Sequence, residues 1–427
     1  MHVVIVGNGV AGTEAALAIR RRLDPSRARI TLISEEHPYF FSRTALMYAY
    51  MERMQRRDLE PYERGVWARQ QIERIQNRVV DIDADAHTLT LGSGATLSYD
   101  RLLLAVGARP RMVPFKGLEQ VKDGLVNFVS MQDLDACERL TWSTDQAVVI
   151  GGGLIGVELA ESFVHHKIQV SFVVREPYFW PAALAEEEGQ LISEEIRRHG
   201  IELILEREVE RIDTDARGRV SAVHLSDERR LDCQMLGVAI GVTPNVEWLR
   251  EVKTAPALAR GICVDRSFRT SLPDVFAAGD CAEIDRGEDQ PPLLETIWYS
   301  AKLQGQLAAA AILGDAIRYE PPIFYNSSKF FGIEYTTVGQ CVNLAPGTRS
   351  LYRKHPTRPI TQRIIFDEER VLGFSMLGSR WDHTLLTQWI AERRPLDYVR
   401  EHLGRAQFDV EFGRVELSTF QEEERTL

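Results

Sequence analysis

The sequence predicts an α/β fold: two similar units built on parallel sheets, followed by a smaller α+β domain. A buried strand that runs into a glycine-rich turn and then a helix occurs twice, and the two turns lie 144 residues apart. A second apolar strand follows each helix, and this strand–helix–strand order is typical of a parallel sheet. After Pro321 and Pro322 the pattern changes to short strands with one apolar helix, which indicates a C-terminal α+β domain.

The first glycine-rich turn has the features of a dinucleotide site. A strand at residues 3–6 enters a Gly-x-Gly-x-x-Gly turn, a helical pattern runs to residue 22, and a second strand covers residues 30–33. Glycines let the backbone approach a pyrophosphate closely, and the helix N-terminus presents free N–H groups to it. An acid lies 23 residues after the last glycine, the spacing at which a carboxylate binds a ribose hydroxyl. We therefore predict a Rossmann-like site formed by Gly7, Gly9, Val10, Ala11, Gly12 and Glu35.

The second glycine-rich turn repeats this pattern with a different strand end. It predicts a second dinucleotide site formed by Gly151, Gly153, Leu154, Ile155 and Gly156. Where the first unit has its acid, this unit reads Arg175-Glu176. An arginine at this place pairs with the 2′-phosphate of NADPH, whereas an acid suits NADH. The pattern favours NADPH and leaves NADH open.

Composition excludes several classes of protein. The chain has 427 residues and a net charge of −11, which argues against nucleic-acid binding. No apolar run reaches the roughly 18 residues of a membrane-spanning helix, and no signal peptide is visible, so we expect a cytoplasmic protein. The five cysteines are at least 18 positions apart, without a redox pair or zinc spacing, so we expect reduced thiols and no metal site.

Two dinucleotide sites in one chain imply a relay of electrons. One site would hold a flavin dinucleotide, and the other would bind the nicotinamide that delivers a hydride to it. The expected cofactors are therefore FAD and NAD(P)H.

Five landmarks in order resemble the FAD-dependent pyridine nucleotide-disulfide oxidoreductases. They are residues 7–12, 104–110, 151–158, 241–245 and 270–280. Within this superfamily the chain resembles rubredoxin and ferredoxin reductases and the reductase module of nitrite reductase large subunits. The resemblance implies FAD-binding segments at 1–112 and 242–320, an NAD(P)-binding domain at 113–241, and a C-terminal α+β interface domain at 321–427.

The resemblance also implies roles for single residues. Glu35 would hold the adenosine ribose of FAD, and Asp280 would accept a hydrogen bond from a ribityl hydroxyl. The helix near Thr296 would aim its N-terminus at the flavin, and Glu158 would lie near the nicotinamide as a catalytic residue. The further cofactor-binding positions implied are Ala105, Gly107, Gly241, Gly279, Ile297 and Trp298.

One segment departs from the relatives. Thr44 occupies the position of the reactive cysteine found in coenzyme A disulfide reductases, and threonine supplies no thiolate for disulfide exchange. Rubredoxin and ferredoxin reductases carry Arg-Pro-x-Leu-Ser-Lys here; Arg43 and Leu46 match, but Tyr48 replaces the lysine. Nitrite reductase-like modules, which lack the lysine, fit best. Arg43 is therefore the candidate for a catalytic cation near the flavin.

We therefore expect an NAD(P)H oxidoreductase that passes electrons through FAD to an external acceptor. A ferredoxin- or rubredoxin-type protein or a small oxidant would accept them, and arginines such as Arg53, Arg56 and Arg57 could face an acidic carrier or only solvent. The C-terminal domain of relatives often forms a dimer interface, which allows a homodimer.

Two alternatives remain. One is a type II NADH:quinone reductase, which would need a membrane-docking face. Core packing or a dimer interface explains the candidate face better; it consists of Trp381, Leu385, Leu386, Trp389 and Ile390. The other is a non-enzymatic NAD(P)H-binding flavoprotein similar to apoptosis-inducing factor.

Overall fold

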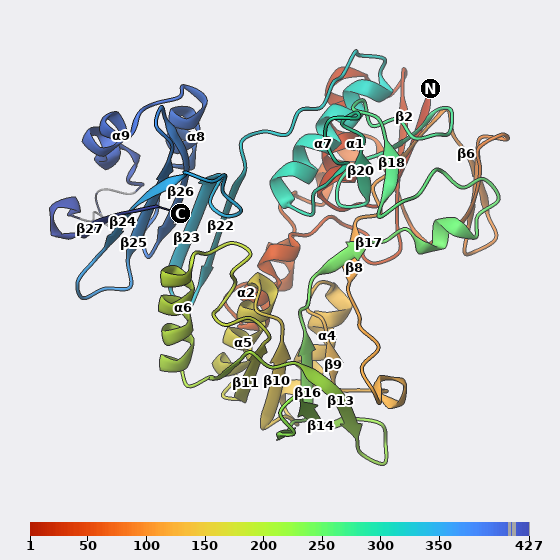
Figure 1. Ribbon diagram of the computed structural model, residues 1–427. Helices are drawn as coiled ribbons and strands as arrows, with labels where there is room; N and C mark the ends of the chain where they lie inside the picture. The colour runs from red at the N-terminus through yellow and green to blue at the C-terminus, as the bar shows by residue number, and fades with distance from the viewer. Residues whose placement is uncertain (409–410, 412–415, 427) are drawn as a thin grey trace. The chain divides into compact units, whose positions relative to one another are not determined.

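A computed structural model describes residues 1–408, 411 and 416–426 (Figure 1). The chain divides into two compact units, each assembled from three segments. The first comprises Met1–Arg111, Val129–Asp135 and Gly241–Pro321, and the second comprises Met112–Phe128, Ala136–Ile240 and Pro322–Leu427. Each unit holds one parallel sheet, which confirms the predicted α/β class. The four domain ranges implied by the resemblance stay a prediction.

The first unit is built on a five-stranded parallel sheet in the order β19-β7-β1-β2-β3. Its central strand β1 is apolar and almost wholly buried, as a parallel strand covered on both faces must be. Strand β2 pairs with β1 on one side, and strand β7 pairs with β1 on the other side. Ligands of such sheets bind where the strand order reverses, beyond the carboxyl end of the central strand. The strands are β1 (His2–Val6), β2 (Arg29–Ser34), β3 (Ile72–Gln76), β7 (Arg101–Leu104) and β19 (Val275–Ala277).

Two helices of the first unit, α1 (Val10–Arg22) and α7 (Trp298–Ile312), lie side by side (Figure 1). Their contact is very close, because a Cβ added at Gly305 would overlap the Ala11 carbonyl oxygen. Buried alanines line the rest of the α7 face. Small residues thus bring the helix that leaves the first glycine turn against the helix that follows β19.

The first unit also contains two short helices and three small sheets. These are α2 (Leu46–Tyr50), α3 (Gly65–Arg69), β4 (Val79–Asp83) with β5 (Thr88–Leu91) and β6 (Thr96–Ser98), β8 (Ala108–Pro110) with β17 (Val242–Pro244), and β18 (Ile262–Val264) with β20 (Ala282–Ile284) and β21 (Leu293–Leu294).

The second unit repeats the same sheet plan in the order β12-β11-β10-β16-β9, again all parallel. Helix α5 (Leu154–His165) follows the central strand β10, as α1 follows β1. The other elements are β10 (Gln146–Ile150), β11 (Gln169–Val174), β12 (Glu202–Leu205), β16 (Met235–Val238), β9 (Leu125–Val126), α6 (Glu186–Arg198), and the sheet of β13 (Val209–Thr214), β14 (Val220–Leu225) and β15 (Arg230–Asp232). Helix α4 (Met131–Thr141) begins within the first unit's range.

The C-terminal residues of the second unit form a six-stranded antiparallel sheet in the order β22-β23-β26-β25-β24-β27. Helix α8 (His383–Ala391) packs on β23 and β26 and buries Leu386 and Trp389 in the core of this region. The apolar face considered for membrane docking is therefore core packing. The remaining elements are β22 (Tyr325–Phe330), β23 (Ile333–Gly339), β24 (Arg349–Lys354), β25 (Thr361–Phe366), β26 (Val371–Leu377), β27 (Gln421–Thr426) and α9 (Leu396–His402).

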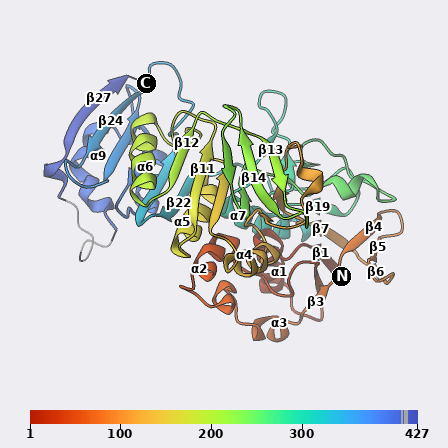
Figure 2. The same cartoon turned by 90° about the horizontal axis from the view of Figure 1, so that it is seen from below.

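Within the second unit, α6 lies between the parallel sheet and the C-terminal sheet (Figure 2). The Arg363 guanidinium on β25 donates to Glu188 on α6 at 2.7 and 2.9 Å and to Glu187 at 2.7 Å. Arg363 and Glu188 are both fully buried. A buried charge is costly unless it is paired, so this cluster fixes how the C-terminal sheet sits on α6.

No helix within the described part of the chain is long and apolar enough to cross a membrane.

Candidate functional site

The first glycine turn is shaped by close backbone contacts. Gly7 adopts a left-handed φ of +106°, and a Cβ there would overlap the Ala105 carbonyl oxygen. A Cβ on Gly12 would overlap the Gly7 carbonyl oxygen. At Gly9 an added Cβ would meet nothing, so this glycine faces open space. The turn thus packs tightly on its inner side and is open where a ligand would approach.

The second glycine turn has the same geometry in the second unit. Gly151 has a φ of +109°, and an added Cβ would overlap the Ala239 carbonyl oxygen. A Cβ on Gly156 would overlap the Gly151 carbonyl oxygen, while Gly153 faces open space. Two independent copies of one backbone shape indicate two sites for the same kind of ligand.

Both turns fit the diphosphate of a dinucleotide. Gly9 and Gly153 take the N-cap positions of α1 and α5, and neither helix has a side-chain cap. The first helical residues, Val10 and Ala11 in α1 and Leu154 and Ile155 in α5, bring their backbone N–H groups to this end. Uncapped N–H groups at a helix N-terminus form a ready anion site.

Two acids, Glu35 and Glu36, directly follow β2 and lie in different environments. Glu35, the predicted ribose ligand, is exposed and faces Arg78 at 3.8 Å. Glu36 is mostly buried; it accepts two hydrogen bonds from Arg43, at 3.0 and 2.5 Å, and one from the Met131 N–H at 3.1 Å. Glu35 is therefore the acid that is free to contact a ligand, and Glu36 has a structural role that sequence spacing did not reveal.

Arg43 is held by the protein on several sides. Besides the paired contact with Glu36, its guanidinium donates to the Val129 carbonyl oxygen at 2.8 Å and lies over the Phe41 ring. Its charge also acts on Asp280, whose pKa it lowers. The structure therefore brings together Arg43 and Asp280, which lie far apart in the sequence.

Asp280 follows the left-handed Gly279 at the end of β19. Burial raises the pKa of its carboxyl to about 6, with Arg43 acting in the opposite direction. No side chain in the described part of the chain donates a hydrogen bond to this carboxylate. A partly buried acid to which no described side chain donates has room for a ligand hydroxyl, which fits the ribityl contact expected of FAD.

Ala105, Gly107 and Gly241 lie near one another in the first unit. The Ala105 N–H donates to the carbonyl of Val6 at 2.8 Å, and Gly107 and Gly241 flank the β8–β17 ladder with φ values of +67° and +102°. Gly241 therefore belongs with the first glycine turn rather than with Gly151.

Helix α7 begins at Trp298, two residues later than the predicted start, because Ile297 is still extended. Ile297 is the N-cap, without a side-chain cap, and Thr296 before it is exposed. The Lys302 ammonium lies 5.4 Å from the Trp298 ring centroid. The first turn of α7 thus keeps its N–H groups available.

Glu158 lies on α5 after the second glycine turn. Its carboxylate accepts a hydrogen bond from Ser328 Oγ on β22 at 3.2 Å. Burial raises its pKa to about 8, and the nearby Glu161 adds to the shift. No cation within the described residues forms an ion pair with it. Ser328 is a contact that spacing did not reveal, because it comes from the C-terminal sheet.

Arg175 ends β11 with its side chain largely exposed. Its Nε donates to Glu176 Oε1 at 2.7 Å, so the two candidate coenzyme-selecting residues are paired. The two terminal nitrogens of its guanidinium have no hydrogen bond to a described residue and could contact a phosphate.

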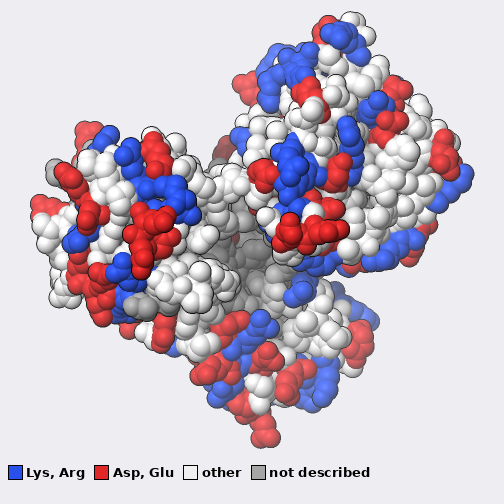
Figure 3. Space-filling view, turned by 45° about the horizontal axis from the view of Figure 1, so that its top comes forward, with Lys and Arg blue, Asp and Glu red and all other residues white. Residues whose placement is uncertain are grey.

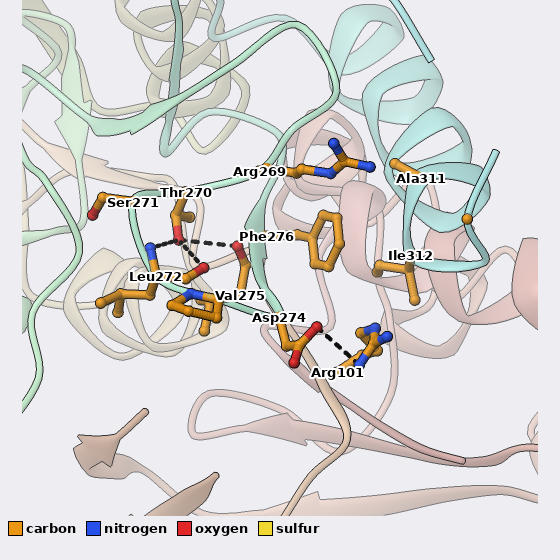
Figure 4. A pocket seen from close by; sticks show the side chains of 12 residues that line it. Arg101, Arg269, Thr270, Ser271, Leu272, Asp274, Val275, Phe276, Ala311 and Ile312 are labelled. Carbon is orange, nitrogen blue, oxygen red and sulfur yellow. Dashed lines mark hydrogen bonds and ion pairs between the residues drawn. The ribbon is translucent and has the colours of Figure 1, made fainter. Parts of the chain in front are cut away.

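One cavity, of about 320 Å³, lies away from these residues (Figure 4). Residues at the starts of β7 and β19 line this cavity, at the end of the sheet opposite the first glycine turn. Arg101 pairs with Asp274 at 2.9 Å on one side, and Arg269 and Phe276 line the other. None of the predicted site residues lines it.

No group of three or more His, Cys, Asp or Glu in the described part of the chain could hold a metal ion. The five cysteines, all described, are free thiols.

Comparison with known proteins places the chain in a family. The family model for pyridine nucleotide-disulphide oxidoreductases matches residues 1–311. The ferredoxin–NAD(+) reductase component of the biphenyl dioxygenase system of Paraburkholderia xenovorans (strain LB400) is 29% identical over 316 residues, 74% of this chain and 75% of that protein. Nitrite reductase [NAD(P)H] of Bacillus subtilis (strain 168) is 28% identical over 383 residues, 88% of this chain, and the chain spans 45% of its length.

A solved structure has the same fold along nearly the whole chain. The ferredoxin reductase for the CYP199A2 system from Rhodopseudomonas palustris superposes with a TM-score of 0.81 at 26% identity and covers 93% of this chain and 98% of that one. The chain therefore belongs to the pyridine nucleotide-disulphide oxidoreductase family and is an NAD(P)H-dependent flavoprotein oxidoreductase of its ferredoxin reductase-like branch.

Proposed function

We propose that this protein takes electrons from NAD(P)H through FAD and passes them to a ferredoxin- or rubredoxin-type protein. The duplicated glycine turn carries the proposal, because one chain that binds two dinucleotides can bring a hydride donor and an electron store together. When bound, FAD would supply a two-electron acceptor that takes hydride from nicotinamide and releases electrons to a carrier.

In the first unit the chain's residues would hold FAD. The turn at Gly7, Gly9 and Gly12 would bind the diphosphate, and Glu35 would bind the adenosine ribose. Asp280, to which no described side chain donates, would accept a hydrogen bond from a ribityl hydroxyl. The open first turn of α7 would place the positive end of its helix dipole at the flavin.

Arg43 would place a fixed positive charge near the flavin. Its position depends on Glu36, which binds both terminal nitrogens of the guanidinium. A charge held in advance stabilises negative charge on a bound group without reorganisation.

In the second unit the turn at Gly151, Gly153 and Gly156 would hold the NAD(P)H diphosphate. Arg175 would take the 2′-phosphate and so favour NADPH, with its partner Glu176 as the residue that would instead favour NADH. Glu158 would orient the nicotinamide, and its raised pKa means that its carboxyl can hold a proton at neutral pH.

Two observations lead us to propose a redox protein as the electron acceptor: the missing cysteine at Thr44 and the names of similar proteins. Thr44 rules out a thiol step at the position where disulfide reductases use cysteine. Two similar proteins are named as ferredoxin reductases. On the face drawn in Figure 3, acidic and basic residues lie beside one another. Arg56, one of the arginines considered for docking, pairs with Asp135 at 2.6 Å. Docking would therefore rely on local pairs rather than on a broad basic field.

The free thiols support a reducing, cytoplasmic compartment. A homodimer through the C-terminal sheet stays a further part of the proposal.

The glycine turns give a paired test of the two sites. Gly12→Ala should yield protein without the visible flavin band, because its Cβ collides with the Gly7 carbonyl. Gly156→Ala, the matched change, should keep FAD but lose rapid bleaching by NAD(P)H, while dithionite still reduces it. Absorbance spectra under anaerobic conditions measure both. Loss of FAD in Gly156→Ala with retention in Gly12→Ala would contradict the assignment.

The preference for NADPH over NADH tests the proposed role of Arg175. Arg175→Ala should raise KM for NADPH by about tenfold or more, the loss of one charge-assisted contact, and leave KM for NADH nearly unchanged. Steady-state rates with each coenzyme measure the ratio. Arg198→Ala, at another exposed arginine of the second unit, is the control. Equal effects of Arg175→Ala on both coenzymes would remove Arg175 from the selection.

The raised pKa of Glu158 predicts that the stability of the protein depends on pH. A carboxyl of pKa about 8 in the native state releases its proton at about pH 4.3 when unfolded. Between these values the native state binds the extra proton, so this contribution to stability falls as pH rises from about 5 to about 8 and then levels off. Glu158→Gln should lack this decline in melting temperature, whereas exposed Glu194→Gln should keep it. An unchanged decline in Glu158→Gln would show that Glu158 is ionised at neutral pH.

A further inference from the structure

A polar network inside the first unit connects the Gly279–Asp280 turn to both ends of α7. Its centre is the carboxylate of Glu295, which lies just before the helix. This carboxylate accepts hydrogen bonds from Ser300 Oγ at 2.9 Å, Gln304 Nε2 at 3.2 Å and the Tyr319 hydroxyl at 2.7 Å. One acid thus joins the segment before α7, two of the helix's residues and the segment that follows it.

Gln304 extends this network to the turn that carries Asp280. Its Oε1 accepts the Gly279 N–H at 2.9 Å, while its Nε2 donates to Glu295. Gln304 and Tyr319 are 1% and 2% exposed, so water does not replace these contacts. A buried amide that uses its oxygen and its nitrogen for two different partners has its orientation fixed.

The turn has little freedom of its own. Gly279 is left-handed at φ +83°, and a Cβ there would come within 2.9 Å of Ala11 Cβ on α1. The hydrogen bond from Gly279 to Gln304 therefore sets the turn between the two helices. Any shift of Gln304 would move the backbone that presents Asp280.

A second acid on the other side of α7 has the same kinds of partner and supplies an internal comparison. Glu14 on α1 accepts from the Tyr62 hydroxyl at 2.9 Å and from Gln306 Nε2 at 2.8 Å. Neither Tyr62 nor Gln306 bonds to the Gly279–Asp280 turn in the described part of the chain. Tyrosine, glutamine and glutamate therefore occur twice around one helix, and only the Glu295 set reaches the turn.

We propose that Glu295, Gln304 and Tyr319 are positioning residues for FAD. They act through the backbone of the Gly279–Asp280 turn and the first turn of α7, and they set where the Asp280 carboxylate and the free helix N–H groups meet the cofactor. This inference rests on the proposed function, because it assumes that FAD occupies the first unit.

The network places a negative charge behind the first turn of α7, and three donors hold it there. Loss of one donor leaves the partly buried Glu295 carboxylate less satisfied and lets the helix start shift. The effect should therefore appear at the cofactor, as weaker binding and a changed flavin environment, and not only as lower stability.

The test uses two matched pairs of variants. Gln304→Met keeps the side chain's length but removes its donor and acceptor, and Gln306→Met makes the same change on the same helix at Glu14. Tyr319→Phe and Tyr62→Phe each remove one hydroxyl from a glutamate. We expect the Kd for FAD to be about tenfold higher in Gln304→Met and in Tyr319→Phe than in their controls. We also expect the visible circular dichroism and midpoint potential of bound flavin to shift in these two variants alone.

The outcomes separate this inference from the proposed function. Wild-type protein that binds no FAD would contradict the proposed function itself. Wild-type protein that binds FAD, with equal affinity, potential and dichroism in each variant and its control, would overturn the positioning role. Variants that merely melt at lower temperature, with bound flavin unchanged, would also overturn it. If Gln304→Met fails to fold, the milder Tyr319→Phe decides between the two results.

Discussion

The structure depends most on how closely backbone approaches backbone at its glycine turns. A β-carbon at Gly7 or Gly12 would overlap a carbonyl oxygen, and so would one at Gly151 or Gly156. These contacts bring each first helix against its central strand and point the uncapped helix N-terminus toward the carboxyl end of the sheet. The same constraint returns between α1 and α7, where Gly305 lets the two helices touch. This geometry leaves uncapped backbone N–H groups at each helix start, and that is why we propose each turn as a diphosphate site.

Charged side chains are then placed around these turns by contacts between parts of the chain that follow different strands. Glu36 holds Arg43 seven residues further on, and Arg43 acts on the distant Asp280, so the three residues form one electrostatic group in the first unit. In the second unit Glu158 takes its partner Ser328 from the C-terminal sheet. Burial raises the pKa of both acids, and carboxyl groups shifted in this way are frequent at functional sites.

The sequence predicted the parts that depend on neighbours in the chain. Glycine spacing indicated both turns, and apolar runs indicated the strands β1 and β10, because those signals are local. It could not show that Glu36, and not Glu35, binds Arg43, since both acids follow the same strand. Nor could it show that Gln304 reaches Gly279 or that Ser328 reaches Glu158, because those pairs are 25 and 170 residues apart. Contacts of that kind are set by how sheets and helices pack, and no local pattern records them.

Rapid-mixing spectroscopy of the purified holoprotein would follow the proposed transfer of electrons from coenzyme through flavin to a carrier. The protein would be mixed anaerobically with NADH or NADPH, and the flavin band would be followed before an oxidised ferredoxin is added. We expect rapid bleaching of the flavin band by at least one coenzyme and return of the band when the carrier is added. A flavin band that neither coenzyme bleaches would contradict the proposed electron transfer.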